Sequence, residues 1–237
     1  MAKTIFSVQH AVAEILADKE QRAQYLYRLA KSRKYRMAIN NLDKNRTNVF
    51  FKPVSWKSAR DNEYLLVLGV SSKTDAKANG PFFLEIMLFL MDGTLNVATV
   101  NHNTEGPKVE IFKYHFFKRY NERFLKQPEL DIKDVIYIFF KANPHNCYKQ
   151  MESKKFNDSY AFIFPDGVSL GNFYYEKKYC VHNTFVTRMM LYKKQTENAE
   201  DLLDFIDSVS TKSFAELRDN NTFLSPVKNT VYKSGFY

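Results

Sequence analysis

His115, Arg119 and Arg123 recur at every fourth position of the segment "KYHFFKRYNERF", a spacing that places them on one row of a helix. A guanidinium binds phosphate through parallel N–H donors, and an imidazole exchanges a proton near neutral pH. RNA cleavage at the 2′-hydroxyl needs a proton carrier and stabilisation of negative charge on phosphorus. The row could supply both functions without a metal ion.

The two arginines of this row have few acids nearby. Glu122 is the only acid on the helix body after Glu110, and Arg119 reaches it at i, i+3, whereas the adjacent Arg123 does not face it. The acceptor for Arg123 is therefore a carboxylate on another element, such as Asp158, a strand carbonyl, or a bound phosphate. The first two make the helix architectural, and the third makes it an active site.

A later strand segment, "CVHNTFVTRMM", offers further polar groups. Alternation along a strand puts His182, Thr184 and Val186 on one face and Asn183 with Phe185 on the other. Thr184 could donate to a phosphate oxygen, and His182 could be a second proton carrier. The alternative is that both are ordinary strand residues. The predicted catalytic set is His115, Arg119, Arg123, Thr184 and His182, and Tyr179 is a further candidate.

The net charge of +9 is concentrated in one block, because residues 31–60 hold nine Lys/Arg and Asp43 as the only acid. Such a patch attracts polyanions through counterion release, with RNA favoured over DNA here as the partner. The alternative is a solvated face, or one that pairs with an acidic helix predicted at 197–217. The predicted nucleic-acid-binding residues are Lys31, Arg33, Lys34, Arg36, Lys44 and Arg46.

The elements that would position these residues alternate between helical and strand-like texture. Asp92-Gly93 between β-rich runs predicts a tight hairpin, and Asp131 predicts a helix N-cap. Turns are also expected at Pro165-Asp166-Gly167 and near Lys177-Lys178. The predicted helices are 5–38 (one or two), about 109–127, 129–143 and 197–217, and the predicted strands lie within 48–56, 63–72, 81–102 and 159–191.

This order predicts an α+β fold, with N-terminal helices, a largely antiparallel sheet carrying a packed helix pair, and a C-terminal helix. The absence of regular βαβ alternation and of a glycine-rich phosphate loop argues against nucleotide-binding folds. The predicted organisation is a basic helical extension at 1–62, an α+β core at 63–219 and a tail at 220–237.

The segment "HFFKRYNERFLKQPELDIKDVIYIF" (115–139) resembles the H-x-x-x-R-x-x-x-R helix and following helix of the barnase, EndoU, colicin D and RelE-like nuclease superfamily, which has phage-borne and toxin versions. The segment "TFVTRMMLYKKQ" (184–195) is similar to its closing strand. The resemblance spans about 109–196 and implies metal-independent ribonuclease activity, with His115, Arg119, Arg123 and Thr184 in the active site. Small toxins of this superfamily lack the long N-terminal part and the hairpin at 81–101. The alternative that this chain is a relative with the same fold and without the catalytic activity therefore stays open.

Other chemistries have less support. Cys147 and Cys180 are the only cysteines, and no His lies at zinc-ligand spacing, so neither a metal nor another cofactor is expected. The chain shows no leader and no membrane span, which favours a cytoplasmic protein. Two hypotheses remain: a ribonuclease-like or RNA-binding protein of phage or mobile-element type, and a non-enzymatic interaction protein with Arg119 and Arg123 in a buried ion-pair network. A protein inhibitor or partner is a further candidate ligand.

Overall fold

The computed structural model describes residues 2–45, 47–100, 108–143, 147–150, 159–187 and 189–190. These residues form two compact units, residues 2–100 and residues 108–190. Helices and strands occur in both units, which confirms the α+β class. The predicted helix at 197–217, the tail at 220–237, Asp158 and Arg46 lie outside the described residues.

The first unit contains a mixed sheet with the strand order β2-β4-β5-β6, in which β1 also pairs with β5 and β3 with β4. The β1–β5 pair is parallel, whereas the other pairs are antiparallel. This sheet is therefore largely antiparallel, with one short parallel pair. The strands are β1 (Lys3–Thr4), β2 (Thr47–Phe50), β3 (Val54–Lys57), β4 (Glu63–Ser72), β5 (Phe82–Met91) and β6 (Thr94–Val100).

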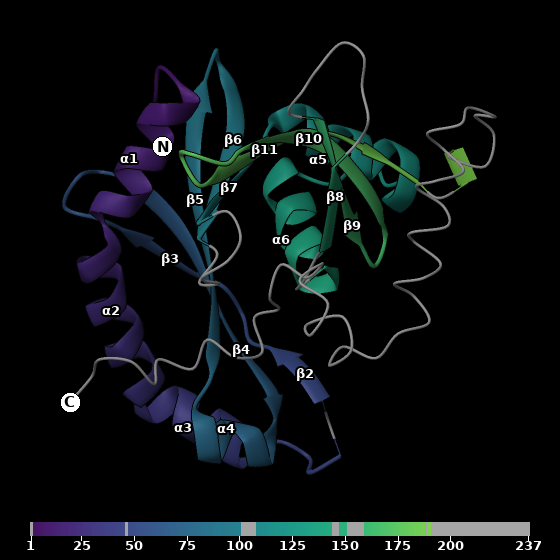
Figure 1. Cartoon of the computed structure of the whole chain (residues 1–237). Coiled ribbons are helices and arrows are strands. Elements are labelled where there is room, and N and C mark those ends of the chain that lie inside the picture. The colour runs from purple at the N-terminus through teal and green to yellow at the C-terminus, as the bar shows by residue number, and fades with distance from the viewer. Residues whose placement is uncertain are drawn as a thin grey trace. The chain divides into compact units, whose positions relative to one another are not determined.

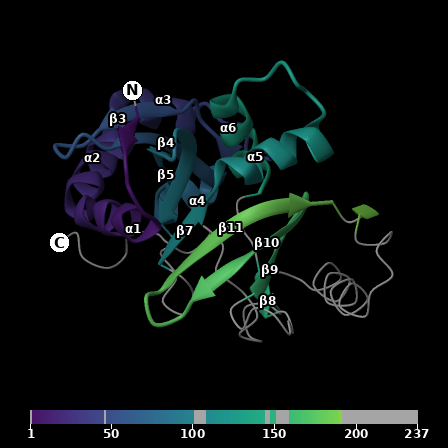
Figure 2. The same cartoon turned by 90° about the horizontal axis from the view of Figure 1, so that it is seen from above.

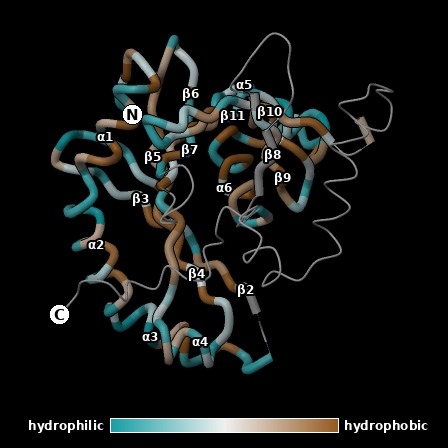
Figure 3. The backbone as a smooth tube through the Cα atoms, viewed as in Figure 1, coloured by the Kyte–Doolittle hydropathy of each residue, from teal (hydrophilic) through white to brown (hydrophobic). Residues whose placement is uncertain are grey.

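Strands β4 and β5 supply much of the hydrophobic core of this unit. Leu66, Val67 and Leu68 are consecutive and completely buried, so β4 is covered on both faces. The hydrophobic colour in Figure 3 follows both strands. The predicted hairpin at Asp92-Gly93 is confirmed, because Met91 pairs with Thr94 and the two turn residues have φ of 53° and 70°, as a twisted two-residue turn requires.

Helices α1 and α2 run alongside this sheet, and α3 and α4 lie together near one end of β4 (Figure 1). The expected helical stretch is confirmed, but the structure divides it at Asp18 and Ser32. Ser32 ends α2 and caps α3, since its side chain accepts from the Tyr35 N–H. The short α4, capped by Ser72, was not predicted. The helices are α1 (Val8–Ala17), α2 (Lys19–Lys31), α3 (Arg33–Asn40) and α4 (Lys73–Asn79).

The boundary between the two units differs from the predicted one. Residue 62 lies between β3 and β4, whose register runs from Val54↔Leu66 to Lys57↔Glu63. A division there would cut hydrogen-bonded neighbours apart. The first unit instead extends through β6, so the basic helices and the first half of the strands form one compact structure.

The second unit contains a sheet with the strand order β7-β11-β10-β9-β8. The β7–β11 pair is parallel and the remaining pairs are antiparallel. The predicted turns are confirmed, because Phe164 pairs with Gly167 across a two-residue loop and Tyr174 pairs with Tyr179. The strands are β7 (Val109–Phe112), β8 (Cys147–Gln150), β9 (Ser159–Phe164), β10 (Gly167–Tyr174) and β11 (Tyr179–Val186).

The helix that carries His115 begins later than expected. All four residues of Val109–Phe112 are buried and form β7, because they pair with β11, so the prediction of a helix from residue 109 is wrong. Helix α5 (Tyr114–Tyr120) continues into a π-helical turn, η1 (Asn121–Leu125). Helix α6 (Ile132–Ala142) follows, and Asp131 caps it by accepting from the Lys133 N–H, as predicted.

Helices α5 and α6 lie on the same side of the second sheet (Figure 2), and aromatic rings fill the space between them. The Phe112 ring of β7 packs against Phe116 at 5.2 Å and against Phe140 at 5.1 Å between centroids. Phe139 contacts Phe116 at 4.9 Å and Phe164 at 5.2 Å. These contacts set the orientation of α5 about its own axis: the aromatic side chains of the helix face the sheet, and the row of His115, Arg119 and Arg123 does not.

A bulge in β11 changes which side chains face these helices. Leu170 pairs with Thr184 and the next residue of β10, Gly171, pairs with His182, so Asn183 is an extra residue. His182 and Phe185 consequently both face α5, with ring centroids 6.0 Å and 5.8 Å from that of Phe116. The expectation from simple alternation, that His182 and Phe185 lie on opposite faces, is wrong.

We predict that Gly171→Ala destabilises the second unit by about 2–3 kcal/mol. A methyl group at this position would lie 2.0 Å from the Val181 carbonyl oxygen, and a main-chain atom of a paired strand cannot move away as the end of a flexible side chain can. Gly93→Ala is the comparison, since a Cβ there meets no atom within 4 Å and meets only the penalty for positive φ, about 1 kcal/mol. Urea unfolding gives both free energies. Equal losses would contradict a close backbone approach at the bulge.

Candidate functional site

The row of His115, Arg119 and Arg123 lies on α5 and η1, and its arginines have protein acceptors. His115 is exposed. Arg119 Nη1 donates to Glu122 Oε2 at 2.6 Å, and Arg123 Nη1 donates to the main-chain carbonyl of Phe185 on β11. Partial burial, together with the charge of Arg119, lowers the pKa of Arg123. Of the acceptors considered for Arg123, a strand carbonyl is the one observed.

His182 lies beneath the helices and not at the surface. Its side chain has no exposed area, and its ring stacks on Phe112 with centroids 4.0 Å apart and planes 5° apart. Burial lowers the pKa of His182, although the Glu110 carboxylate acts in the opposite direction. A side chain without exposed surface does not contact an RNA backbone, which removes His182 from the predicted catalytic set. Thr184, beyond the bulge, is half-buried.

Polar side chains from three strands surround the His182 ring. Nδ1 lies 2.9 Å from Ser169 Oγ, and Nε2 lies 3.2 Å from Glu110 Oε2 and 3.4 Å from Cys180 Sγ. Burial raises the pKa of the Cys180 thiol, and the Glu110 carboxylate raises it further. The prediction of no metal-ligand spacing missed this cluster. Its one local signal was Cys-x-His on a strand, which places both side chains on one face.

The second candidate site is the basic segment, residues 28–36 ("RLAKSRKYR"), at the junction of α2 and α3. Its cations are all exposed, as is Lys44. No carboxylate among the described residues forms an ion pair with any of them. Prediction from the block at 31–60 missed Arg28, which extends the row back along α2. The cations of the segment are Arg28, Lys31, Arg33, Lys34 and Arg36.

Helix α3 presents its cations because its two buried residues lie on the opposite side. Tyr35 and Ile39, four residues apart, are buried with 4% and 9% exposure, and Tyr35 packs edge-on against Phe51 at 5.6 Å. Arg33 and Arg36, three residues apart, therefore point to solvent. Along α2 and α3, hydrophilic residues alternate with hydrophobic ones (Figure 3).

Two large side chains stand exposed within or beside the basic segment. Tyr27 is 43% exposed and Met37 is 51% exposed. Lys31 Nζ lies 4.2 Å from the Tyr27 ring centroid and also contacts the Tyr27 hydroxyl. An aromatic ring beside several cations that pair with no carboxylate among the described residues offers both a stacking surface and charge, the two components that single-stranded nucleic acids bind.

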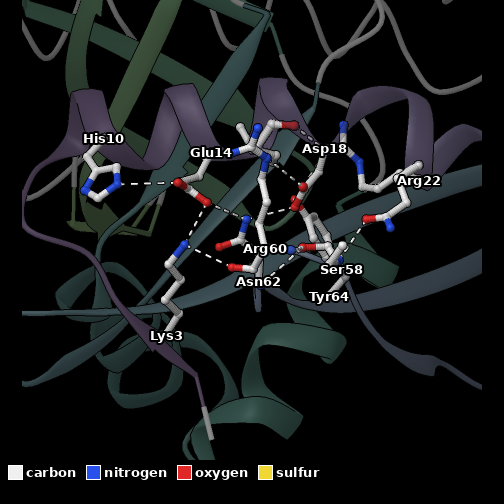
Figure 4. Close-up of polar contacts among 12 residues, drawn as sticks. Lys3, His10, Glu14, Asp18, Arg22, Ser58, Arg60, Asn62 and Tyr64 are labelled. Carbon is white, nitrogen blue, oxygen red and sulfur yellow. Dashed lines mark hydrogen bonds and ion pairs between the residues drawn. The ribbon is translucent and has the colours of Figure 1, made fainter.

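The helix that leads into the basic segment is anchored by a buried polar network (Figure 4). Asp18, at the α1–α2 junction, is 2% exposed, and its Oδ2 accepts from Asn62 Nδ2 at 2.8 Å and from the Tyr64 hydroxyl at 2.9 Å. Asn62 Nδ2 also donates to Glu14 Oε2 at 2.8 Å. The junction is thus fixed to the β3–β4 loop and to β4.

Arg22, one turn along α2 from Asp18, forms a buried ion pair with β5. Its Nε donates to Glu85 Oε2 at 2.7 Å, and the two side chains are 1% and 2% exposed. Its Nη1 donates to the Ile15 carbonyl and, at 3.3 Å, to the Tyr64 hydroxyl. A buried arginine network therefore exists at Arg22. Arg119, which the interaction-protein hypothesis placed in such a network, is 37% exposed.

Comparisons with protein-family models, with curated proteins and with solved structures gave no match to this chain. Within the part of the chain that the structure describes, no helix combines the length and the apolar character that crossing a membrane requires.

We predict that Arg22→Met lowers the free energy of unfolding of the first unit by about 3–5 kcal/mol, because it breaks the buried Arg22–Glu85 ion pair and places an apolar side chain opposite a buried carboxylate. The double variant Arg22→Met/Glu85→Leu should recover much of that loss, since neither charge then remains. Urea unfolding of the three proteins measures the difference.

The matched control is Lys57→Met, which breaks the exposed Lys57–Asp61 pair of 2.9 Å on the same unit. We expect its urea midpoint to equal that of the wild type, because exposed ion pairs contribute little. If Arg22→Met lowers the urea midpoint no more than Lys57→Met does, the buried pair does not anchor α2.

The Glu14 carboxylate should make the stability of the first unit sensitive to acid. Burial opposes ionisation of Glu14, but hydrogen bonds from Lys3 and Asn62 outweigh it and hold the pKa of Glu14 below its usual value of 4.5. The unfolded chain then takes up the proton first, so stability from this carboxylate is present above pH 4.5 and is lost as the pH falls through the lower, folded-state pKa.

Glu14→Gln should therefore show a shallower loss of stability than the wild type between about pH 5 and pH 3, measured as the urea midpoint against pH. Glu20→Gln, at an exposed position of α2, is the control and should keep the wild-type slope. Identical slopes for wild type and Glu14→Gln would show that these hydrogen bonds do not stabilise the charged form.

Proposed function

We propose that this protein binds RNA and that the basic segment on its first unit grips the phosphodiester backbone. The observation that carries the proposal is the exposure of Arg28, Lys31, Arg33, Lys34 and Arg36 within nine residues that contain no acid. Arginine and lysine side chains replace the counterions that are condensed along the phosphates of a nucleic acid, and the release of those ions drives binding.

The protein around the segment supports this role. The buried contacts of Asp18 and Arg22 hold α2 on the sheet, and Tyr35 holds α3. The cations therefore project from fixed helices, which lowers the entropy lost when a strand binds. The exposed Tyr27 ring favours an unpaired strand, whose bases are free to stack, over a duplex.

Gripping the backbone, and not cleaving it, is the form of the proposal that the site geometry favours. The ribonuclease resemblance needs Arg119 and Arg123 to stabilise a phosphorane and a second proton carrier beside His115. Arg119 already has the Glu122 carboxylate at 2.6 Å, and His182 is completely buried. His115 is the exposed histidine of that set.

The test is fluorescence anisotropy with a labelled single-stranded RNA over a range of salt concentrations. Arg33→Gln/Lys34→Gln/Arg36→Gln should weaken binding at least about tenfold and reduce the slope of log K against log salt by about 2. Each phosphate contact with a single strand releases about 0.7 of a counterion, and the variant loses three such contacts. Substitution by glutamine at these exposed positions leaves the fold intact.

The control triple is Lys19→Gln/Lys57→Gln/Lys141→Gln, which removes the same charge at exposed positions elsewhere. Equal weakening by both triples would show general attraction to a basic protein and would contradict a defined site. Preference for an acidic protein over RNA would also overturn the proposal. The same mixtures, incubated in EDTA and resolved by length, should contain intact RNA; shortening that His115→Ala abolishes would establish cleavage.

A further inference from the structure

We propose that Glu110, Cys180 and His182 form a binding site for one divalent transition-metal ion of the zinc class in the second unit. Each residue offers one ligand atom, and the three atoms all lie within 4.8 Å of one another. The residues are 6%, 0% and 0% exposed. The site is separate from the basic segment and does not depend on the proposed RNA binding.

The register of two strands brings these donors together. Cys180 and His182 are two residues apart on β11, so their side chains leave the same face. Glu110 lies opposite Cys180 in the parallel β7–β11 pair. Ligands carried on hydrogen-bonded strands are held more accurately than ligands carried on loops.

Two of the three donor–donor distances are close to those of a tetrahedral coordination sphere. His182 Nε2 lies 3.4 Å from Cys180 Sγ and 3.2 Å from Glu110 Oε2. Metal–ligand bonds of about 2.0–2.3 Å separate the ligand atoms of such a sphere by roughly 3.3–3.7 Å. The third pair, Cys180 Sγ and Glu110 Oε2, lies within 4.8 Å, so a bound ion would hold these two atoms at the tetrahedral separation through side-chain rotation.

The types of donor select the class of ion. One thiolate, one imidazole and one carboxylate suit Zn²⁺, whereas Mg²⁺ and Ca²⁺ require oxygen donors. Three protein ligands leave the fourth tetrahedral position for water. Binding converts the Cys180 thiol to a thiolate and releases its proton to solvent.

The surroundings of the His182 ring fit this arrangement. Ser169 Oγ lies 2.9 Å from Nδ1, so Nδ1–H can donate to the hydroxyl and leave the Nε2 lone pair for the metal. The ring cannot rotate freely, because it stacks on Phe112 at 4.0 Å. A hydrogen-bonded partner behind a ligating histidine is a common feature of metal sites.

The competing arrangement is a metal-free hydrogen-bond chain. The Ser169 hydroxyl would donate to Nδ1, and Nε2–H would donate to the Glu110 carboxylate. That chain uses the opposite tautomer of His182 and gives Cys180 no required role. The two arrangements therefore differ in whether Cys180 Sγ and a metal ion form a bond.

The experiment refolds the full chain from denaturant with Co²⁺, Zn²⁺ or EDTA, because donors this deeply buried take up metal as the fold forms. After removal of free metal, we expect one Co²⁺ per chain, visible absorption typical of tetrahedral cobalt, and a thiolate-to-cobalt charge-transfer band that Zn²⁺ abolishes. The Zn²⁺ form should melt at a higher temperature than the EDTA form.

Variants separate the ligands from their surroundings. Cys180→Ser should lose the charge-transfer band, whereas Cys147→Ser, at the other cysteine, should keep it. Ser169→Ala should bind cobalt about 10–100-fold more weakly, because His182 loses the partner that orients it. A wild-type chain that refolds with no bound metal and with the same melting temperature in Zn²⁺ and EDTA would overturn the proposal, whether or not the Cys180 variant folds. A charge-transfer band that survives in Cys180→Ser would also overturn it.

Discussion

A guanidinium buried under α2 must be paired, and Glu85 on β5 pairs with it. The Arg22–Glu85 contact of 2.7 Å joins two elements 63 residues apart in the chain, and its two charges are nearly inaccessible to water. An unpaired charge at that depth would cost several kcal/mol, so the helix has one position on the sheet. The placement of α2 on the sheet, which leaves Arg28 and Lys31 of the same helix exposed, follows from that constraint.

The second unit meets a similar demand with a different set of groups. Its core is aromatic, and His182 is enclosed by Phe112, Phe116, Phe162 and Phe164. A polar ring in such a place needs partners, and Ser169, Glu110 and Cys180 stand around it. The bulge at Asn183 then returns Phe185 to the same side, so the core continues past the polar cluster without a gap.

The two candidate sites differ in the physics that they use. The basic segment offers charge at the surface, where binding depends on salt and where the sequence of the ligand matters little. The Glu110–Cys180–His182 cluster offers three different donor atoms inside the core, where geometry selects the ion. The first would hold a large flexible polyanion and the second a single ion, so one chain would carry both without competition between them.

The sequence by itself determined the features that depend on neighbouring residues. The hairpin at Asp92-Gly93 follows from two positive φ angles. The helix cap at Asp131 follows from a local hydrogen bond, and the turn at Pro165-Asp166 follows from the geometry of proline. The exposure of the cations within residues 31–44 could also be predicted from the sequence, because lysine and arginine side chains without a nearby acid are rarely buried. The α+β class followed from the order of these elements.

The tertiary structure decided what depends on partners distant in the chain. Residues 109–112 were predicted to begin a helix, because their pairing with β11 is not visible in the sequence. His182 was predicted as a proton carrier or an ordinary strand residue, because the bulge and the four phenylalanines that enclose it are not visible either. The acceptor of Arg123 is a carbonyl 62 residues away, and Glu110 meets His182 across 72 residues. Spacing along one segment cannot report such contacts, because burial and strand register are set by the whole unit and not by any one segment.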